Sequence, residues 1–192
     1  MEYFLYHIEE AKSKFGQDNS LGLPKQISLW AKQFLQQIIE EKGFTFNKEI
    51  GYTLEGKPFF KYNPKQEFSI SHTKQYIAIA LHNKPIGIDI EQVRQYKASI
   101  AQRFLHPKEA IYLASLSNAN LQNRAFTQLW TLKEAYVKCT GEGIANNLKT
   151  FQIILPKRAN QNPQILYNKT QVKLQSEFNN DEGIFISICY QE

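Results

Sequence analysis

The chain has 192 residues, of which 42% are hydrophobic and 13% aromatic, and it carries a net charge of +5. This composition predicts a globular protein of one sizeable domain or two small packed halves, and it excludes a mainly disordered chain. The positive charge favours an acidic partner, although an ordinary solvated basic surface would give the same value. The basic residues form no long run, so we expect no nucleic-acid partner.

The two cysteines, Cys139 and Cys189, show neither metal-ligand spacing nor a disulfide framework. Both are therefore predicted to be buried thiols in a reducing compartment. The N-terminal residues include acids where a signal peptide would carry basic residues, and no apolar run reaches the length of about 18 residues that a membrane span needs. We therefore expect a cytoplasmic protein without a membrane partner.

The spacing of apolar residues predicts a strand, a long helix and then further strands in the first part of the chain. The residues between the first strand and the helix are polar and contain glycine, so they predict a loop up to Gly22. The predicted elements are a strand at 3–8, a helix at 24–41, an extended segment at 44–52, a turn at 55–58, and a hairpin of strands at 68–72 and 77–81.

The second part of the chain repeats this order, with a strand, then helices, then strands. The predicted elements are a strand at 86–91, helices at 98–105 and 107–116, a polar linker at 118–123, a helix at 126–143, and strands at 151–155, 171–178 and 184–190. The whole order predicts an α+β fold of two similar halves in tandem, residues 1–84 and 85–192. The apolar runs IAIAL and IFISICY would be equivalent strands of the two halves.

Asp89 and Glu91 lie on the strictly alternating stretch IGIDIE, so both side chains project from the same face of a strand. Their Cα atoms should be about 6.6 Å apart. Two carboxylates at this spacing repel each other unless a cation or a basic group lies between them. A hard divalent cation suits them, since Mg²⁺ typically uses one or two carboxylates together with a substrate phosphate. The alternative is an exposed strand face with two solvated acids.

The helix at 126–143 carries Lys133 in the middle of its apolar face, with Glu134 and Lys138 one turn apart on the border of that face. A lysine on a core-facing stripe is costly unless it has a partner. The helix is therefore a candidate for part of a site. The alternative is a surface pair of Glu134 and Lys138, with Lys133 extending its ammonium to solvent.

Two shorter motifs are weaker signals. Ser71, His72 and Thr73 end a predicted strand, where hydroxyls, an imidazole and turn amides can hold phosphate oxygens. Lys57 is presented by the turn Gly56-Lys57-Pro58. Taken alone, the first motif is better explained by an ordinary surface histidine, and the second is only a turn that presents a lysine.

The motifs GKP, SISHT, GIDIE and LWTLKEAYVK follow one another between residues 55 and 151, about half of the chain. In this order and at these distances they resemble the 4′-phosphopantetheinyl transferase family, of the long, two-halved type named after the surfactin synthetase activator. GIDIE and WTLKEAYVK contribute most to the resemblance.

The resemblance implies an enzyme that moves the phosphopantetheine arm of coenzyme A to a serine of an apo acyl or peptidyl carrier protein and releases adenosine 3′,5′-bisphosphate. It implies that Asp89, Glu91 and Glu134 hold Mg²⁺, with Mn²⁺ as an alternative, and that Asp89 also contacts coenzyme A through the metal. Glu134 would be the base and Lys138 would neutralise phosphate charge. The nucleotide end of coenzyme A would be bound by Lys57, Ser71, His72 and Thr73.

These implied roles agree with general chemistry, because phosphoryl transfer needs an in-line nucleophile, a charge-neutralising metal and a base in reach. Lys133 would pair with a carboxylate of the site. Acidic carrier proteins suit a basic enzyme, and two halves in one chain would let a monomer form the site. Two other hypotheses remain at this point: a non-catalytic module that binds carrier proteins or nucleotides, and a different metal-dependent phosphotransferase or hydrolase.

Overall fold

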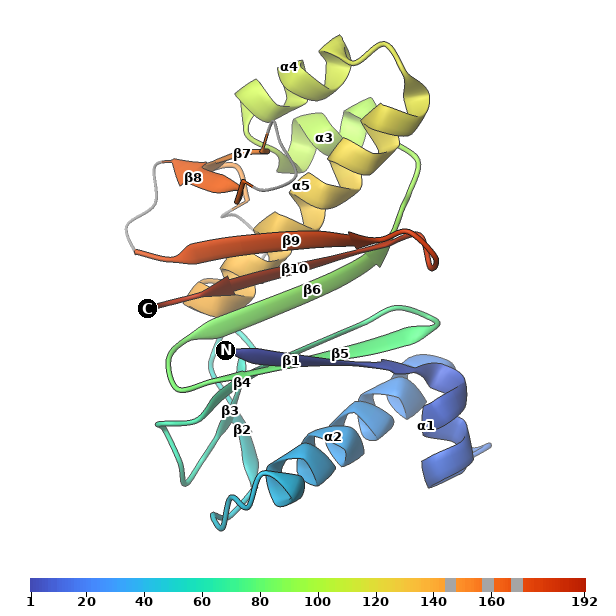
Figure 1. The fold of residues 1–192 in the computed structure, drawn as a ribbon, viewed down its shortest axis with the longest axis vertical. Coiled ribbons are helices and arrows are strands. Elements are labelled where there is room, and N and C mark those ends of the chain that lie inside the picture. Colours follow the sequence, from blue (N-terminus) through green and yellow to red (C-terminus); the bar gives the residue numbers. More distant parts are fainter. Residues whose placement is uncertain (144–147, 157–160, 167–170) are drawn as a thin grey trace.

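The structure of the chain, a computed structural model, describes residues 1–143, 148–156, 161–166 and 171–192. Four layers are stacked along the long axis of the molecule, namely helices, a sheet, a second sheet and helices (Figure 1). The first sheet has the strand order β1-β5-β4, and the second has the order β6-β10-β9. In the part of the chain that the structure describes, no helix is both long and apolar enough to cross a membrane.

The first half builds one helical layer and one sheet, together with a small two-stranded sheet. Its elements are β1 (Glu2–His7), α1 (Ile8–Phe15), α2 (Leu23–Glu41), β2 (Ile50–Tyr52), β3 (Pro58–Phe60), β4 (Glu67–His72) and β5 (Tyr76–His82).

The second half repeats this plan, with three helices among its described residues. Its elements are β6 (Ile86–Gln92), α3 (Ala98–Phe104), α4 (Pro107–Ser115), α5 (Ala119–Thr140), β7 (Gln152–Ile154), β8 (Gln164–Leu166), β9 (Lys173–Asn179) and β10 (Ile184–Tyr190).

The two halves share one topology. In each sheet the strand that comes last in the sequence, β5 or β10, lies in the centre and pairs antiparallel with both neighbours. These central strands are the apolar runs IAIAL and IFISICY. The predicted α+β fold of two similar halves is therefore confirmed, while the division of function between residues 1–84 and 85–192 stays a prediction.

Alternation along the strands explains how the described residues divide among three apolar clusters. On β5, Ile77 and Ile79 face α2, whereas Ala78 and Ala80 face the second sheet. On β6, every second residue of IGIDIE, beginning with Ile86, enters the cluster between the sheets. The other residues of that strand, Gly87 and Asp89 among them, therefore face away from this cluster, toward α5.

Several parts of the secondary structure differ from the sequence-based prediction. Strands β3 and β8 were not predicted, and of the extended segment predicted at 44–52 only Ile50–Tyr52 is a strand. The stretch predicted as a loop after β1 begins with helix α1, whose first turn is capped by the side chain of His7. Only Ile8 and Ala11 of this short helix are buried. Its amphipathic signal was too small to distinguish it from a loop. The predicted linker at 118–123 is the first turn of α5, where the side chain of Asn118 accepts hydrogen bonds from the amides of Asn120 and Leu121.

Candidate active site

Helix α5 contacts strand β6 backbone to backbone at Gly87. A Cβ atom at this position would lie 2.0 Å from the carbonyl oxygen of Ala135 and 2.4 Å from the amide nitrogen of Cys139. Only glycine allows this approach. The glycine of GIDIE therefore brings the acids of β6 within reach of the helix that carries Glu134 and Lys138.

Asp89 is the centre of the site. Its Oδ1 atom lies 2.7 Å from the ammonium of Lys138 and accepts a hydrogen bond of 2.7 Å from the hydroxyl of Ser71. Lys138 also donates to the backbone oxygen of Ile88. Asp89 is buried, and among the described residues its Oδ2 atom has no hydrogen-bond partner. A buried carboxylate oxygen without a donor is poised to bind a cation.

The serines of SISH join the two halves of the molecule. The hydroxyl of Ser69 accepts a hydrogen bond of 3.0 Å from the amide of Ile88, and that of Ser71 accepts one of 3.4 Å from the amide of Ile90. These amides belong to β6, which among the described strands of its sheet pairs only with β10. The two serines of β4 therefore accept hydrogen bonds from backbone amides on the open edge of β6. These bonds fix Asp89 relative to the first half. Ser69 was not singled out in the sequence.

Glu134 lies on α5 and is only 7% exposed. Burial, supported by the nearby charge of Asp89, raises the pKa of Glu134 to about 7, although Lys138 acts in the opposite direction. A carboxylate whose pKa lies near neutrality is suited to take up a proton from a substrate. Glu134 lies one helical turn before Lys138, which contacts Asp89, so the two separate motifs meet here. Their joint role in binding and catalysis stays a prediction.

Glu91 forms an ion pair with Arg94, whose guanidinium also lies 5.1 Å from the ring centre of Trp130. Burial raises the pKa of Glu91, while Arg94 lowers it and the charge of Asp89 raises it further. Arg94 was missed in the sequence, because nothing in a single arginine after GIDIE distinguishes it from a solvated surface charge.

His72 and Thr73 follow Ser71 at the end of β4. His72 is exposed; partial desolvation and the charge of Lys138 lower its pKa, while the charge of Asp89 acts to raise it. The hydroxyl of Thr73 accepts hydrogen bonds from the amides of Gln75 and Tyr76, and so shapes the turn into β5. Coenzyme A binding by Ser71, His72 and Thr73 stays a prediction.

Lys57 reaches across the junction of the two halves. Its ammonium donates to the backbone oxygen of Cys139 at 3.0 Å and lies 3.2 Å from Glu67. A cavity of about 290 Å³ opens here, lined by residues of three predicted motifs, among them Lys57, Ser69 and Lys138. Its volume is suited to part of a ligand rather than to a whole dinucleotide.

The residue types around Asp89 fit a hard divalent cation, but the three predicted ligands do not form a closed cage. In the described part of the chain, no three His, Cys, Asp or Glu side chains are arranged to hold a metal ion. Asp89 instead contacts Lys138, and Glu91 contacts Arg94. Mg²⁺ needs few protein ligands when phosphate and water supply the rest, so the free Oδ2 atom of Asp89 and the adjacent Glu134 fit it. The complete ligand set stays a prediction.

Lys133 does not pair with a carboxylate of this site, so that prediction is wrong. Its ammonium lies 3.0 Å from Glu109 of α4, on the side of α5 that faces the apolar core of the second half. Successive helical residues point about 100° apart, which is why Lys133 and Glu134 face different surroundings.

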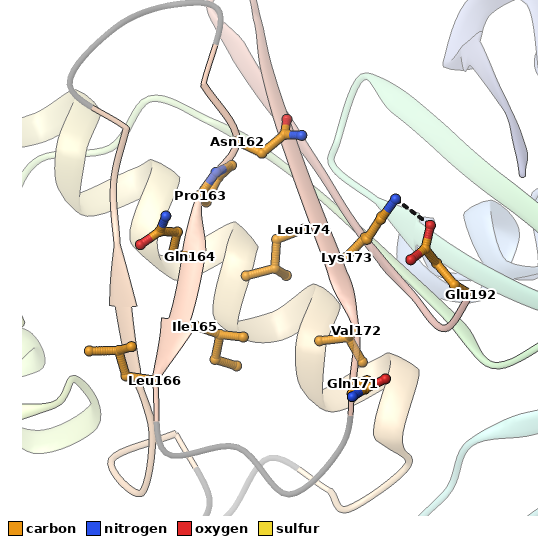
Figure 2. A pocket seen from close by; sticks show the side chains of 10 residues that line it. All are labelled: Asn162, Pro163, Gln164, Ile165, Leu166, Gln171, Val172, Lys173, Leu174 and Glu192. Atoms are coloured by element: carbon orange, nitrogen blue, oxygen red, sulfur yellow. Dashed lines mark ion pairs between the residues drawn. The ribbon is translucent and has the colours of Figure 1, made fainter.

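Another cavity, of about 670 Å³, lies between β8 and β9 (Figure 2). It is lined by residues 162–166 and 171–174 together with Glu192, which pairs with Lys173 at the rim. None of the predicted site residues lines it. Cavity volume therefore points to a different part of the molecule from the junction of the halves, where the predicted charged residues lie.

The sequence profile of the 4′-phosphopantetheinyl transferase superfamily matches residues 85–189. This match includes β6 and α5, and it covers more than half of the chain. The chain therefore belongs to the 4′-phosphopantetheinyl transferase superfamily, which confirms the resemblance seen in the motifs.

Individual proteins of this family are similar to the chain over part of its length. It is 35% identical over 116 residues to the 4′-phosphopantetheinyl transferase gsp of Aneurinibacillus migulanus, which covers 60% of this chain and 46% of that protein. It is 29% identical over 158 residues to the 4′-phosphopantetheinyl transferase ffp of Bacillus subtilis, covering 81% and 69%. The matched region spans about half the length of gsp and of two further curated relatives.

Among solved structures, the chain is similar to a holo-(acyl-carrier-protein) synthase from Bacillus anthracis in complex with CoA (3′,5′-ADP). The two share 18% identity with a TM-score of 0.45, over 55% of this chain and 93% of the other.

Proposed function

We propose that this protein transfers the phosphopantetheine arm of coenzyme A to a serine of an apo carrier protein. The observation that carries the proposal is the convergence of Asp89, Glu134 and Lys138 from β6 and α5 beside a cavity that also contains Lys57. Membership of the 4′-phosphopantetheinyl transferase superfamily supports this reading of the site.

The chemistry asks the protein to place three kinds of group around one pyrophosphate. Asp89 and Glu134, with Glu91 if it leaves Arg94, would hold Mg²⁺ or Mn²⁺. When bound, the metal would neutralise charge on the pyrophosphate oxygens. Lys138 and Lys57 would contribute fixed positive charge to the same oxygens, and Ser71, His72 and Thr73 would border the nucleotide end.

In the transfer itself, the serine hydroxyl oxygen of the carrier protein attacks the phosphorus that bears the pantetheine arm. A P–O bond forms to serine, the P–O bond to the adenosine bisphosphate breaks, and adenosine 3′,5′-bisphosphate leaves with the bond's electron pair. Glu134 accepts the serine proton, directly or through a water molecule. Without a metal, burial raises the pKa of Glu134 to about 7. A bound cation would favour the ionised form of Glu134, which is the form that can accept the proton.

The partner that fits this protein is an acidic carrier domain, because the chain has a net charge of +5. Both halves of one chain supply the groups around Asp89, with Ser71 from the first half and Lys138 from the second. This supports a monomer that works without residues from another copy. A cytoplasmic location remains part of the proposal, since coenzyme A and apo carrier proteins must be available there.

Intact-mass spectrometry of the carrier protein tests the proposal. The protein, coenzyme A, Mg²⁺ and a panel of apo acyl and peptidyl carrier proteins are incubated, with EDTA in a parallel reaction. We expect at least one carrier to gain the mass of one phosphopantetheine arm, and the gain to disappear with EDTA. Glu134→Gln should abolish the gain, whereas Glu10→Gln, on the exposed face of α1, should not. No mass gain on any carrier would contradict the proposal.

A further inference from the structure

A buried ion pair lies behind the site, on the far side of α5 from β6. Glu109 and Lys133 are 2% and 0% exposed, and the Oε2 and Nζ atoms are 3.0 Å apart. The reaction proposed above uses neither residue. Removing two charges from water is costly, and apolar residues often fill such a place equally well. The pair therefore needs a reason beyond stability.

Both charged groups also bind the chain segment that follows α5. The ammonium of Lys133 donates to the backbone oxygens of Leu148 and Phe151 at 2.7 and 2.8 Å, and it lies 4.1 Å from the centre of the Phe151 ring. With Glu109 as the third acceptor, all three donors of the ammonium are used.

Glu109 completes the connection between three parts of the chain. Its Oε1 atom accepts the amide hydrogen of Ile153 at 2.6 Å, and its Oε2 atom accepts that of His106 at 2.8 Å. The start of α4, the middle of α5 and the segment 148–153 therefore meet at one pair of side chains.

This connection bears on the site because α5 is held from two sides. On one side, Gly87 lets the helix backbone touch β6, where Lys138 reaches Asp89. On another, Lys133 ties the same helix to residues 148–153. Since Glu134 is the next residue along the helix, fixing the direction of Lys133 also fixes the direction of Glu134, about 100° away.

We propose that Glu109 and Lys133 form a positioning pair that sets the rotation and depth of α5, and thereby holds Glu134 and Lys138 against Asp89. The pair touches no reacting atom and acts through the helix. This inference rests on the proposed transfer for its kinetic readout, so the test also includes a readout that does not need activity.

The test compares Lys133→Met, the double variant Lys133→Met/Glu109→Gln, and the control Lys149→Met, an exposed lysine of the same segment. Lys133→Met leaves Glu109 buried without a cation, so its urea unfolding midpoint should fall. The double variant should regain much of this loss, because it contains no unpaired buried charge and the carboxamide oxygen introduced in place of the Glu109 carboxylate can still accept the amide hydrogen of Ile153.

The kinetic readout separates positioning from stability. In the folded double variant, kcat and kcat/KM for transfer should fall together by roughly 10- to 100-fold, as expected when an interaction used in the transition state is misplaced. Parental kcat in the folded double variant would overturn the proposal. If the double variant does not fold, the single variant Glu109→Gln replaces it in the test. This variant keeps the hydrogen bonds from Lys133 to the two backbone oxygens, and its kcat should still fall several-fold. Parental kcat in Glu109→Gln would overturn the proposal equally.

Nuclear magnetic resonance supplies the readout that is independent of activity. The amide of Ile153 should exchange faster in the variants, and the amide resonances of Gly87 and Asp89, across the helix from Lys133, should shift relative to those of Lys149→Met. Unchanged resonances at Gly87 and Asp89 would overturn the proposal even if the parent protein transferred nothing. An inactive parent with shifted resonances would instead contradict only the proposed function.

Discussion

The replacement Gly87→Ala tests how closely the site depends on the contact between β6 and α5. The added Cβ atom would lie 2.0 Å from the carbonyl oxygen of Ala135. Atoms in favourable contact lie about 3.5 Å apart, so the helix would have to retreat by roughly 1.5 Å. Overpacking of this kind costs about 1–3 kcal/mol of unfolding free energy. For a chain of this size, that lowers the unfolding temperature by roughly 2–12 °C.

The same retreat should affect activity more than stability. Lys138 now lies 2.7 Å from Asp89, and a displacement of about 1 Å in such an arrangement can reduce the rate by a factor on the order of 100. We therefore expect Gly87→Ala to remain folded at 25 °C while its kcat for transfer falls by roughly 100-fold.

Thermal unfolding and the carrier mass assay measure the two effects on the same samples. Gly22→Ala is the matched control, because a Cβ atom at Gly22 meets nothing within 4 Å and the backbone φ there is −67°. This control should lose less than about 1 kcal/mol and keep its activity. A Gly87→Ala protein with the stability and the kcat of the parent would refute the role assigned to this glycine.

Three other predictions concern neighbouring residues. In metal-free buffer the folded-state pKa of Glu134 is about 7, above its ordinary value of 4.5, so ionising Glu134 opposes folding. Its contribution to the free energy of unfolding is complete below pH 4.5, and about 3 kcal/mol is lost as the pH rises through 7. Urea unfolding at a series of pH values should show this loss in the parent but not in Glu134→Gln, and parallel stability profiles of the two proteins would contradict the prediction. Ser69→Ala should cost about 1–3 kcal/mol by leaving the Ile88 amide unpaired, whereas the exposed Ser28→Ala should cost little; equal losses would speak against the junction role. Arg94→Gln should change the intrinsic fluorescence of the protein and its Mg²⁺ dependence, and an unaltered Mg²⁺ titration would mean that the Arg94–Glu91 pair is unrelated to metal binding.

The sequence predicted the fold well wherever a pattern was long and strongly apolar. The alternation of IGIDIE correctly separated Ile86 from Asp89, and the central strands of both halves were found because each is a continuous apolar run. Helix α1 was missed because it buries only two residues, and the start of α5 was missed because its first turn is polar. Short or solvent-facing helices carry little periodic signal.

The site was predictable in its residue types but not in its contacts. Asp89, Glu134 and Lys138 were identified from motif order, and the structure places them together. The partner of Lys133 was not predictable, because Glu109 lies in another helix and a sequence does not show which acid meets a buried lysine. Ser69 is similar, since its role depends on the unpaired edge of β6, which exists only once the two sheets are assembled.

The most direct test of the central claim follows both products of the reaction at once. Adenosine 3′,5′-bisphosphate is quantified by chromatography while the modified serine of the carrier protein is quantified by peptide mass spectrometry. We expect one nucleotide to be released for each serine modified, and neither product with Glu134→Gln. Nucleotide release without carrier modification would indicate a hydrolase, and binding of coenzyme A without either product would indicate a non-catalytic module; both results would contradict the proposed transfer.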